Sequence, residues 1–149
     1  MRTRKLLEVY LVCCLLVACT GQAGPRDLSA LRADLMARLQ AAETAHAEIT
    51  DLWADLLNRE EISCARRVST PPPFVWAAEE AAAFPEALSA VEALNAGIEQ
   101  VAASVAVWDE ECRSRDEIVT DEVIAAGVQA AEAAVPLLSQ ARATLDRWQ

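Results

Sequence analysis

The chain has 149 residues, which is enough for one domain, and its formal net charge is -10. This charge argues against a nucleic-acid-binding protein, because such a protein needs a basic surface to displace the counterions of phosphates. The four glycines leave no glycine-rich phosphate loop, and 5% aromatic residues in an alanine-rich chain argue against an all-β sandwich. We therefore expect an all-α fold.

The N-terminal segment carries the most specific pattern in the sequence. Basic residues at positions 2, 4 and 5 precede an apolar run, 9–17, which is too short to cross a bilayer as a stable helix. The run leads into Leu16-Val17-Ala18-Cys19, and this pattern resembles the lipobox of bacterial lipoprotein precursors, although Glu8 is unusual before the apolar run. The alternative is that Cys19 is an ordinary buried cysteine of a transmembrane or core helix.

The resemblance implies both a modification and a location. In that class, cleavage falls between Ala18 and Cys19, the Cys19 thiol carries a diacylglycerol, and the new amino group receives an acyl chain such as palmitate. Two or three such chains, at ~0.8 kcal/mol per buried CH₂, make a stable membrane anchor. Because Thr20 rather than an aspartate follows Cys19, the resemblance also implies the outer membrane, with the protein facing the periplasm.

We thus expect three parts: a cleaved signal peptide at 1–18, a lipidated tether at 19–25 and a helical bundle domain at 26–149. Cleavage removes three basic side chains and one acidic side chain, which moves the net charge from -10 to about -12. In the remaining chain no stretch is both long and uncharged enough to predict a second transmembrane span.

Three long tracts of the bundle domain have apolar residues at three- and four-residue spacing, which predicts helices. The first begins at Leu28 and the second at Pro85, a residue suited to a first helical turn. Ser114 and Glu117 have the spacing of a capping box and predict the start of the third, in which Pro136 should produce a kink. The predicted stripes are Leu28, Leu31, Leu35, Ala42, Ala45, Ile49, Leu52 and Leu56; Leu88, Val91, Leu94, Ile98, Val101, Val105, Trp108 and Cys112; and Ile124, Ala131, Leu138, Leu145 and Trp148.

The segment between the first two tracts contains Ser69-Thr70-Pro71-Pro72-Pro73, which cannot lie inside a helix and predicts a stiff, extended connector. After it, the alanine-rich stretch 74–84 is expected to form a short extra helix.

Cys64 and Cys112 are the two cysteines that remain once two others leave with the signal peptide and Cys19 carries lipid. In an oxidising compartment we expect them to form a disulfide, and two reduced, buried cysteines are the alternative. Each lies near the end of a predicted helix, and in an antiparallel hairpin these ends would be ~40 Å apart. Residues 65–84 span up to ~66 Å when extended, which lets the second helix run parallel to the first. We therefore predict a small three-helix bundle with a proline-rich crossover connector.

No set of residues predicts an active site. Glu43 and His46 have the E-x-x-H spacing of di-iron bundles, but such a site needs a second histidine and the chain has one. The motifs of covalent haem and of a serine or cysteine nucleophile are also missing. Adjacent carboxylates, such as Glu60 and Glu61, diverge on a helix and are expected to be solvated. We therefore predict no catalytic residue, metal site, cofactor or small-molecule substrate, and an enzyme stays the weakest alternative.

The sequence favours a protein-binding role. The acidic surface can attract a basic partner, and tryptophans can anchor an interface. Trp76, beside the prolines of the connector, is the speculative candidate for partner binding, with a cap on the open end of the bundle as a slightly favoured alternative. We expect a non-catalytic, lipid-anchored binding, assembly or scaffold component of the bacterial cell envelope. The alternative is an immunity-type or inhibitor lipoprotein that neutralises a basic toxin or envelope hydrolase.

Overall fold

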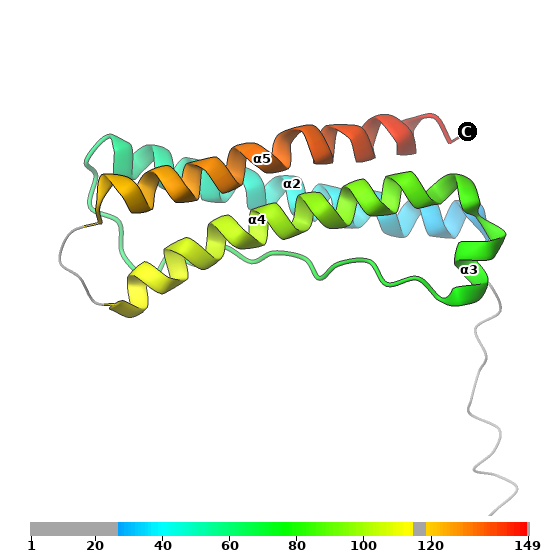
Figure 1. Cartoon of the computed structure of the whole chain (residues 1–149), viewed down its shortest axis with the longest axis horizontal. Coiled ribbons are helices and arrows are strands. Elements are labelled where there is room, and N and C mark those ends of the chain that lie inside the picture. The colour runs from blue at the N-terminus through cyan, green and yellow to red at the C-terminus, as the bar shows by residue number, and fades with distance from the viewer. Residues whose placement is uncertain (1–26, 115–118, 149) are drawn as a thin grey trace, which may run out of the picture.

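The computed structural model describes residues 27–114 and 119–148, and every regular element in these residues is helical (Figure 1). The predicted all-α class is therefore confirmed. In chain order the elements are α2 (Leu28–Leu57), α3 (Ala78–Ala83), one turn of 3-10 helix named η1 (Pro85–Ala87), α4 (Leu88–Ser114) and α5 (Asp121–Asp146). The predicted signal peptide 1–18, the lipidation residue Cys19 and the tether 19–25 lie outside the described residues.

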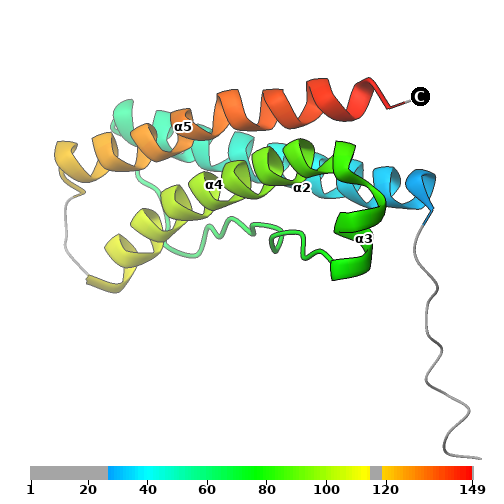
Figure 2. The same cartoon turned by 45° about the vertical axis from the view of Figure 1, so that its right-hand side comes forward.

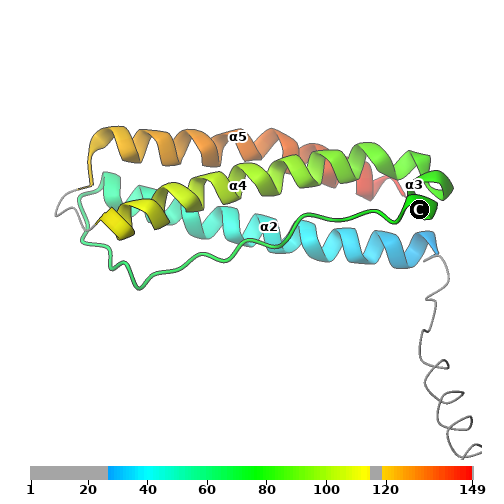
Figure 3. The same ribbon diagram turned by 60° about the horizontal axis from the view of Figure 1, so that its bottom comes forward.

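The long helices α2, α4 and α5 lie side by side, and α2 and α4 run in the same direction (Figures 1 and 2). Helix α5 runs antiparallel to both and packs against both. Residues 58–77, which we name the strap, connect the end of α2 to α3 without a helix and return along the bundle beside α2 and α4 (Figure 3). The start of α2, the short α3 and the end of α5 therefore lie at one end of the bundle (Figure 1).

The sequence explains why α2 forms where it does. The Asp27 carboxylate accepts a hydrogen bond from the Ala30 backbone N–H at 2.7 Å and caps the first turn. Arg59, just past the helix, has φ 61°, the left-handed conformation that ends many helices. Between these ends the predicted stripe is buried, except that Leu28 and Leu56 are half-buried. The buried residues of α2 are Leu31, Leu35, Leu39, Ala42, Ala45, Ile49, Leu52 and Trp53.

Helix α5 begins later than the capping-box spacing predicts. Ser114 is the last residue of α4, and its hydroxyl donates to a carbonyl oxygen three residues earlier, whereas Glu117 lies outside the described residues. The N-cap of α5 is Thr120, whose hydroxyl accepts a hydrogen bond from the Val123 N–H at 3.3 Å. Threonine caps a helix as serine does, and two acidic residues in the first turn favour the positive end of the helix dipole. The capping-box prediction was therefore wrong.

Helix α5 is also more apolar than expected. Among the described residues it is the one helix that is long and apolar enough to cross a membrane by length and composition, with a hydropathy of 1.2. The expectation that no stretch after the signal peptide is both long and uncharged enough for a transmembrane span was therefore wrong. The helix continues through Pro136 and buries its inner face against α2 and α4, as the core helix of a bundle does. Only 28% of its most apolar 18-residue stretch is buried, so much of this apolar helix faces outward.

One buried hydrogen-bond network joins α2, α4 and α5. The Trp53 indole N–H donates to the Ser104 hydroxyl at 2.9 Å, and that hydroxyl donates to the Gly127 carbonyl oxygen at 2.8 Å. The Trp53 ring meets the Trp108 ring edge-on, with the ring centroids 6.2 Å apart. A Cβ atom at Gly127 would lie 2.2 Å from Trp53 Cζ2, so only glycine permits this close approach of α5 to α2.

Candidate functional site

Glu43 and His46, the pair with metal-site spacing, each take part in a contact between α2 and α5. The Arg142 guanidinium donates two hydrogen bonds to the Glu43 carboxylate, one of them from Nε at 2.8 Å. The hydrogen bonding to Glu43 raises the pKa of Arg142 above its ordinary value. His46 Nε2 lies 3.0 Å from the Ala131 carbonyl oxygen. No three His, Cys, Asp or Glu side chains within residues 27–114 and 119–148 are placed to hold a metal ion.

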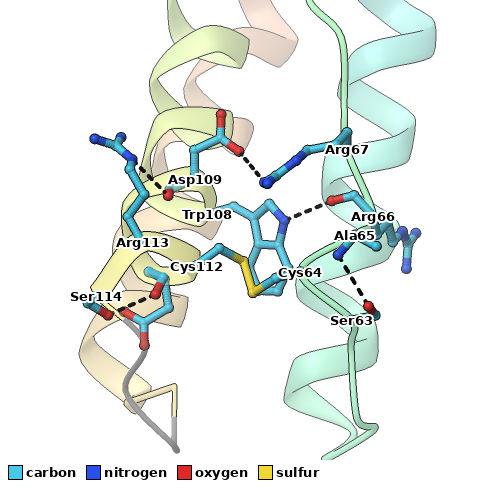
Figure 4. The surroundings of a disulfide bond; sticks show 11 residues. Ser63, Cys64, Ala65, Arg66, Arg67, Trp108, Asp109, Cys112, Arg113 and Ser114 are labelled. Carbon is cyan, nitrogen blue, oxygen red and sulfur yellow. Dashed lines mark hydrogen bonds and ion pairs between the residues drawn. A yellow bond between two sulfur atoms is a disulfide. The ribbon is translucent and has the colours of Figure 1, made fainter.

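Cys64 of the strap and Cys112 of α4 are joined in the structure, with their Cα atoms 5.5 Å apart (Figure 4). This separation is usual for a disulfide. Cys112 is two residues before the end of α4, and α2 stops at the same end of the bundle (Figure 1). Formation of the bond in an oxidising compartment stays a prediction.

Side chains next to the two sulfur atoms attach the strap to both helices. The Trp108 indole N–H of α4 donates to the Arg66 carbonyl oxygen at 3.1 Å, and Arg67 pairs with Asp109 of α4 at 3.1 Å. The Arg66 guanidinium reaches the other way and pairs with Asp55 of α2 at 2.7 Å. Figure 4 shows Trp108 extending from α4 toward the strap beside the two sulfur atoms. The cysteine pair therefore belongs to a connected set of contacts between the strap, α2 and α4.

A second set of contacts holds the strap near its other end. The Asn95 side chain of α4 accepts a hydrogen bond from the Phe74 N–H at 2.7 Å and donates one to the Phe74 carbonyl oxygen at 2.9 Å. The Arg38 guanidinium of α2 donates to the Pro72 carbonyl oxygen at 3.0 Å and lies 5.5 Å from the Phe74 ring centroid. Phe74 and Val68 are buried in the core. The strap is thus packed into the bundle rather than looped away from it.

Trp76, the predicted partner anchor, is half-buried at the end of the strap. Its ring meets the Phe74 ring edge-on, with the centroids 5.4 Å apart, so part of its surface is used within the chain. Val75 next to it is 80% exposed. A role of Trp76 in partner binding stays a prediction.

Sequence reasoning missed an apolar groove along the junction of α2 and α5. Its walls include Ala54 and Leu57 from α2 and Val128 and Val135 from α5, with Glu132 as the acidic residue of its lining. Leu57 is 61% exposed and Val135 is 49% exposed, and both line this groove. The sequence did contain one indication of this groove, which is the low charge of α5. Glu132 is the one charged residue of this helix between positions 123 and 141.

A second hollow shares Leu57 with the first and continues to the end of the bundle. It is lined by Ile62 of the strap, Ile124 of α5 and several charged side chains, namely Arg59, Glu60, Glu61 and Asp121. We name the two hollows together the α2–α5 groove. Its lining contains four carboxylates and one guanidinium, so the groove combines apolar walls with an acidic border.

No protein-family model matches the chain, and neither a curated protein nor a solved structure matches it significantly. A functional conclusion therefore depends on the residues of this chain. The lining of the α2–α5 groove includes Leu57, the last residue of α2, and α2 begins at the opposite end of the bundle (Figure 1).

Proposed function

We propose that the chain is a lipid-anchored, periplasm-facing lipoprotein that works as a non-catalytic binding, assembly or scaffold component of the bacterial cell envelope. The lipobox that ends in Cys19 supports the anchor, and Thr20 after it supports the outer-membrane location. The observation that carries the binding role is the α2–α5 groove, because exposed aliphatic side chains gathered in a groove are typical of surfaces at which proteins dock.

The length of the tether determines how the bundle is presented. Leu28, the first residue of α2, follows Cys19 by nine residues, which span at most ~30 Å. Helix α2 has 30 residues and extends ~45 Å away from that point. Leu57 lies at the far end of this helix, so this part of the α2–α5 groove is separated from the tethered end of the bundle by the length of α2. A partner then meets the groove from the periplasm.

The proposal includes the finer fold, a three-helix bundle of α2, α4 and α5 in which the strap is the proline-rich crossover connector and α3 is the short extra helix. Two features support it: α2 and α4 run in the same direction, and Asn95 and Arg38 bind backbone atoms of the strap from both helices. A connector held in this way adds contacts with both helices to the direct contact between α2 and α4.

The acidic border of the groove favours a second candidate, an immunity-type or inhibitor lipoprotein that neutralises a basic toxin or envelope hydrolase. The two candidates use the same surface and differ in the identity of the partner. A toxin gene next to the gene for this chain would favour the inhibitor, and genes of a secretion or assembly system would favour the scaffold.

The first testable prediction concerns the acylation of Cys19. We expect Cys19→Ser to leave an unprocessed precursor without fatty acid, because a hydroxyl oxygen does not replace the thiol in the thioether linkage that the lipobox implies. Labelling of cells with an alkyne fatty acid, followed by gel electrophoresis, measures acylation and cleavage together. Thr20→Ser is the matched control and should keep both the label and the mature size. Fatty-acid label on the Cys19→Ser chain would overturn the lipoprotein assignment.

A further inference from the structure

We infer that the α2–α5 groove binds a basic amphipathic helix of a partner protein. The inference rests on the proposed binding function and adds the chemistry of the partner to it. It follows from three properties of the groove: exposed aliphatic walls, an acidic border and an α5 wall that extends from Asp121 to Val135.

The walls supply the apolar part of the recognition. Leu57 and Val135 are among the few large aliphatic side chains that the described residues expose, and they face the same groove from different helices. Over positions 123–141 α5 carries Glu132 as its one charged residue, although charged residues make up 24% of the chain. Depletion of charge with retention of aliphatic side chains distinguishes the centre of an interface from ordinary surface.

The acidic border of the groove favours a partner with a positively charged surface. Four carboxylates line it, from Glu60, Glu61, Asp121 and Glu132, against the single guanidinium of Arg59. A second copy of the chain would bring two acidic borders together, and an anionic lipid surface would be repelled in the same way. A segment with basic residues on both sides of an apolar stripe complements the border and the walls at once.

The shape of the groove selects a helix. Its α5 wall extends from Asp121 to Val135, which is ~20 Å of helix, so a partner helix of about 14 residues fills it. An amphipathic helix in a groove between two helices is read through apolar anchors at positions i, i+3 or i+4, and i+7. Leu57, where the two hollows meet, is placed to contact the central anchor.

The test uses the purified full chain in nanodiscs of phosphatidylcholine, a lipid whose neutral head groups do not attract a basic peptide, with empty nanodiscs as the blank. The probe is a fluorescent helical peptide of about 18 residues, slightly longer than the groove, with a leucine stripe flanked by lysines. Two matched peptides separate the contributions: one has the same composition with the stripe scrambled, and one has glutamate in place of every lysine. Fluorescence anisotropy measures Kd.

We expect the basic amphipathic peptide to bind and the two matched peptides not to bind. Leu57→Ser and Val135→Ser should each raise Kd about tenfold, as truncation of a central interface residue does. Val75→Ser, which removes an even more exposed aliphatic side chain from the strap, should leave Kd unchanged. Glu132→Gln should raise Kd at ~50 mM salt and lose this effect at ~500 mM, whereas Glu92→Gln on α4 should have no effect.

Equal affinity of the Leu57→Ser, Val135→Ser and parent chains overturns the inference, and so does a loss of binding caused by Val75→Ser, which would assign docking to the surface around Trp76. Peptide bound only by empty nanodiscs also overturns it. A photocrosslinking residue at Ala54 in the groove or at Val75 on the strap, tested in native membranes, separates this inference from the proposed function. Protein adducts from Val75 alone keep the binding function and overturn the groove; adducts from neither position overturn both.

Discussion

We expect Gly127→Ala to lower the free energy of unfolding by about 3 kcal/mol and Tm by about 10 °C, although alanine is the better helix former. A Cβ at this position would lie 2.2 Å, 2.3 Å and 2.8 Å from three atoms of the Trp53 ring. That ring is 1% exposed and hydrogen-bonded to Ser104, so relief of the clash must displace a buried side chain that is held in place. Displacement of the ring also leaves its buried N–H without an acceptor, which adds to the cost of the clash. Thermal and urea unfolding followed by circular dichroism measure the loss.

Gly97→Ala is the matched control, because it makes the same change in the middle of a neighbouring helix. Its Cβ would lie 2.6 Å from Cδ2 and 2.9 Å from Cγ of the buried Leu138 side chain, which is smaller and more flexible than the Trp53 ring. We expect a smaller loss than for Gly127→Ala, since no buried hydrogen bond is broken and the gain in helix propensity offsets part of the clash. Trp53→Phe should partly rescue Gly127→Ala, because the smaller ring vacates the space that the new methyl group needs. Equal stability of Gly127→Ala and the parent chain would contradict the close approach of α5 to α2.

We expect removal of the Cys64–Cys112 link by a double serine substitution to lower the free energy of unfolding by ~4 kcal/mol in the chain-entropy model. The bond closes a loop with a sequence separation of 48 residues, which limits the unfolded chain strongly. Without it, the hydrogen bond from Trp108 and the ion pair of Arg67 still hold this part of the strap to α4. Urea unfolding with and without a thiol reductant measures the difference, and the reductant should not affect the double serine variant.

Thiol titration provides an independent check of the pairing. The acylated, mature chain, denatured without reductant, should give no free thiol, and after reduction it should give two. Cys64→Ser alone should expose one thiol and reproduce most of the stability loss of the double variant. Two reactive thiols in the unreduced parent chain would show that the cysteines are not paired, and the topological argument built on their proximity would fail with them.

The two structural predictions bear on the proposed binding surface in different ways. Gly127→Ala acts on the contact between α2 and α5, so it should disturb the α2–α5 groove together with the core. Loss of the disulfide acts on the strap and on the end of α4, and it reaches the groove through strap residues such as Glu61 and Ile62. As urea is raised, the Gly127→Ala variant should therefore lose peptide binding and helical structure together. The double serine variant should lose peptide binding at a lower urea concentration than that at which it unfolds.

The helical class and the inner face of each long helix were predictable from the sequence. Apolar spacing is a local property, and residues such as Leu35 and Ile98 lie on the buried side wherever the helix packs. The prolines at 71–73 predicted that the strap is extended, and the expected pairing of Cys64 with Cys112 predicted that it returns along the bundle. The exact start of α5 was less predictable, because Ser114 and Thr120 are both good caps and the competition between them depends on where α4 ends.

The candidate site was not predictable in the same way, because no single segment contains it. One wall of the α2–α5 groove comes from Leu57 and the other from Val135, far apart along the chain, and their meeting depends on the antiparallel packing of α5 on α2. The same packing places Gly127 against Trp53 and pairs Arg142 with Glu43. Periodicity along the sequence determined which side of each helix turns inward, whereas only the tertiary structure decided which helices meet, since that choice depends on how side chains distant in sequence fit together in space.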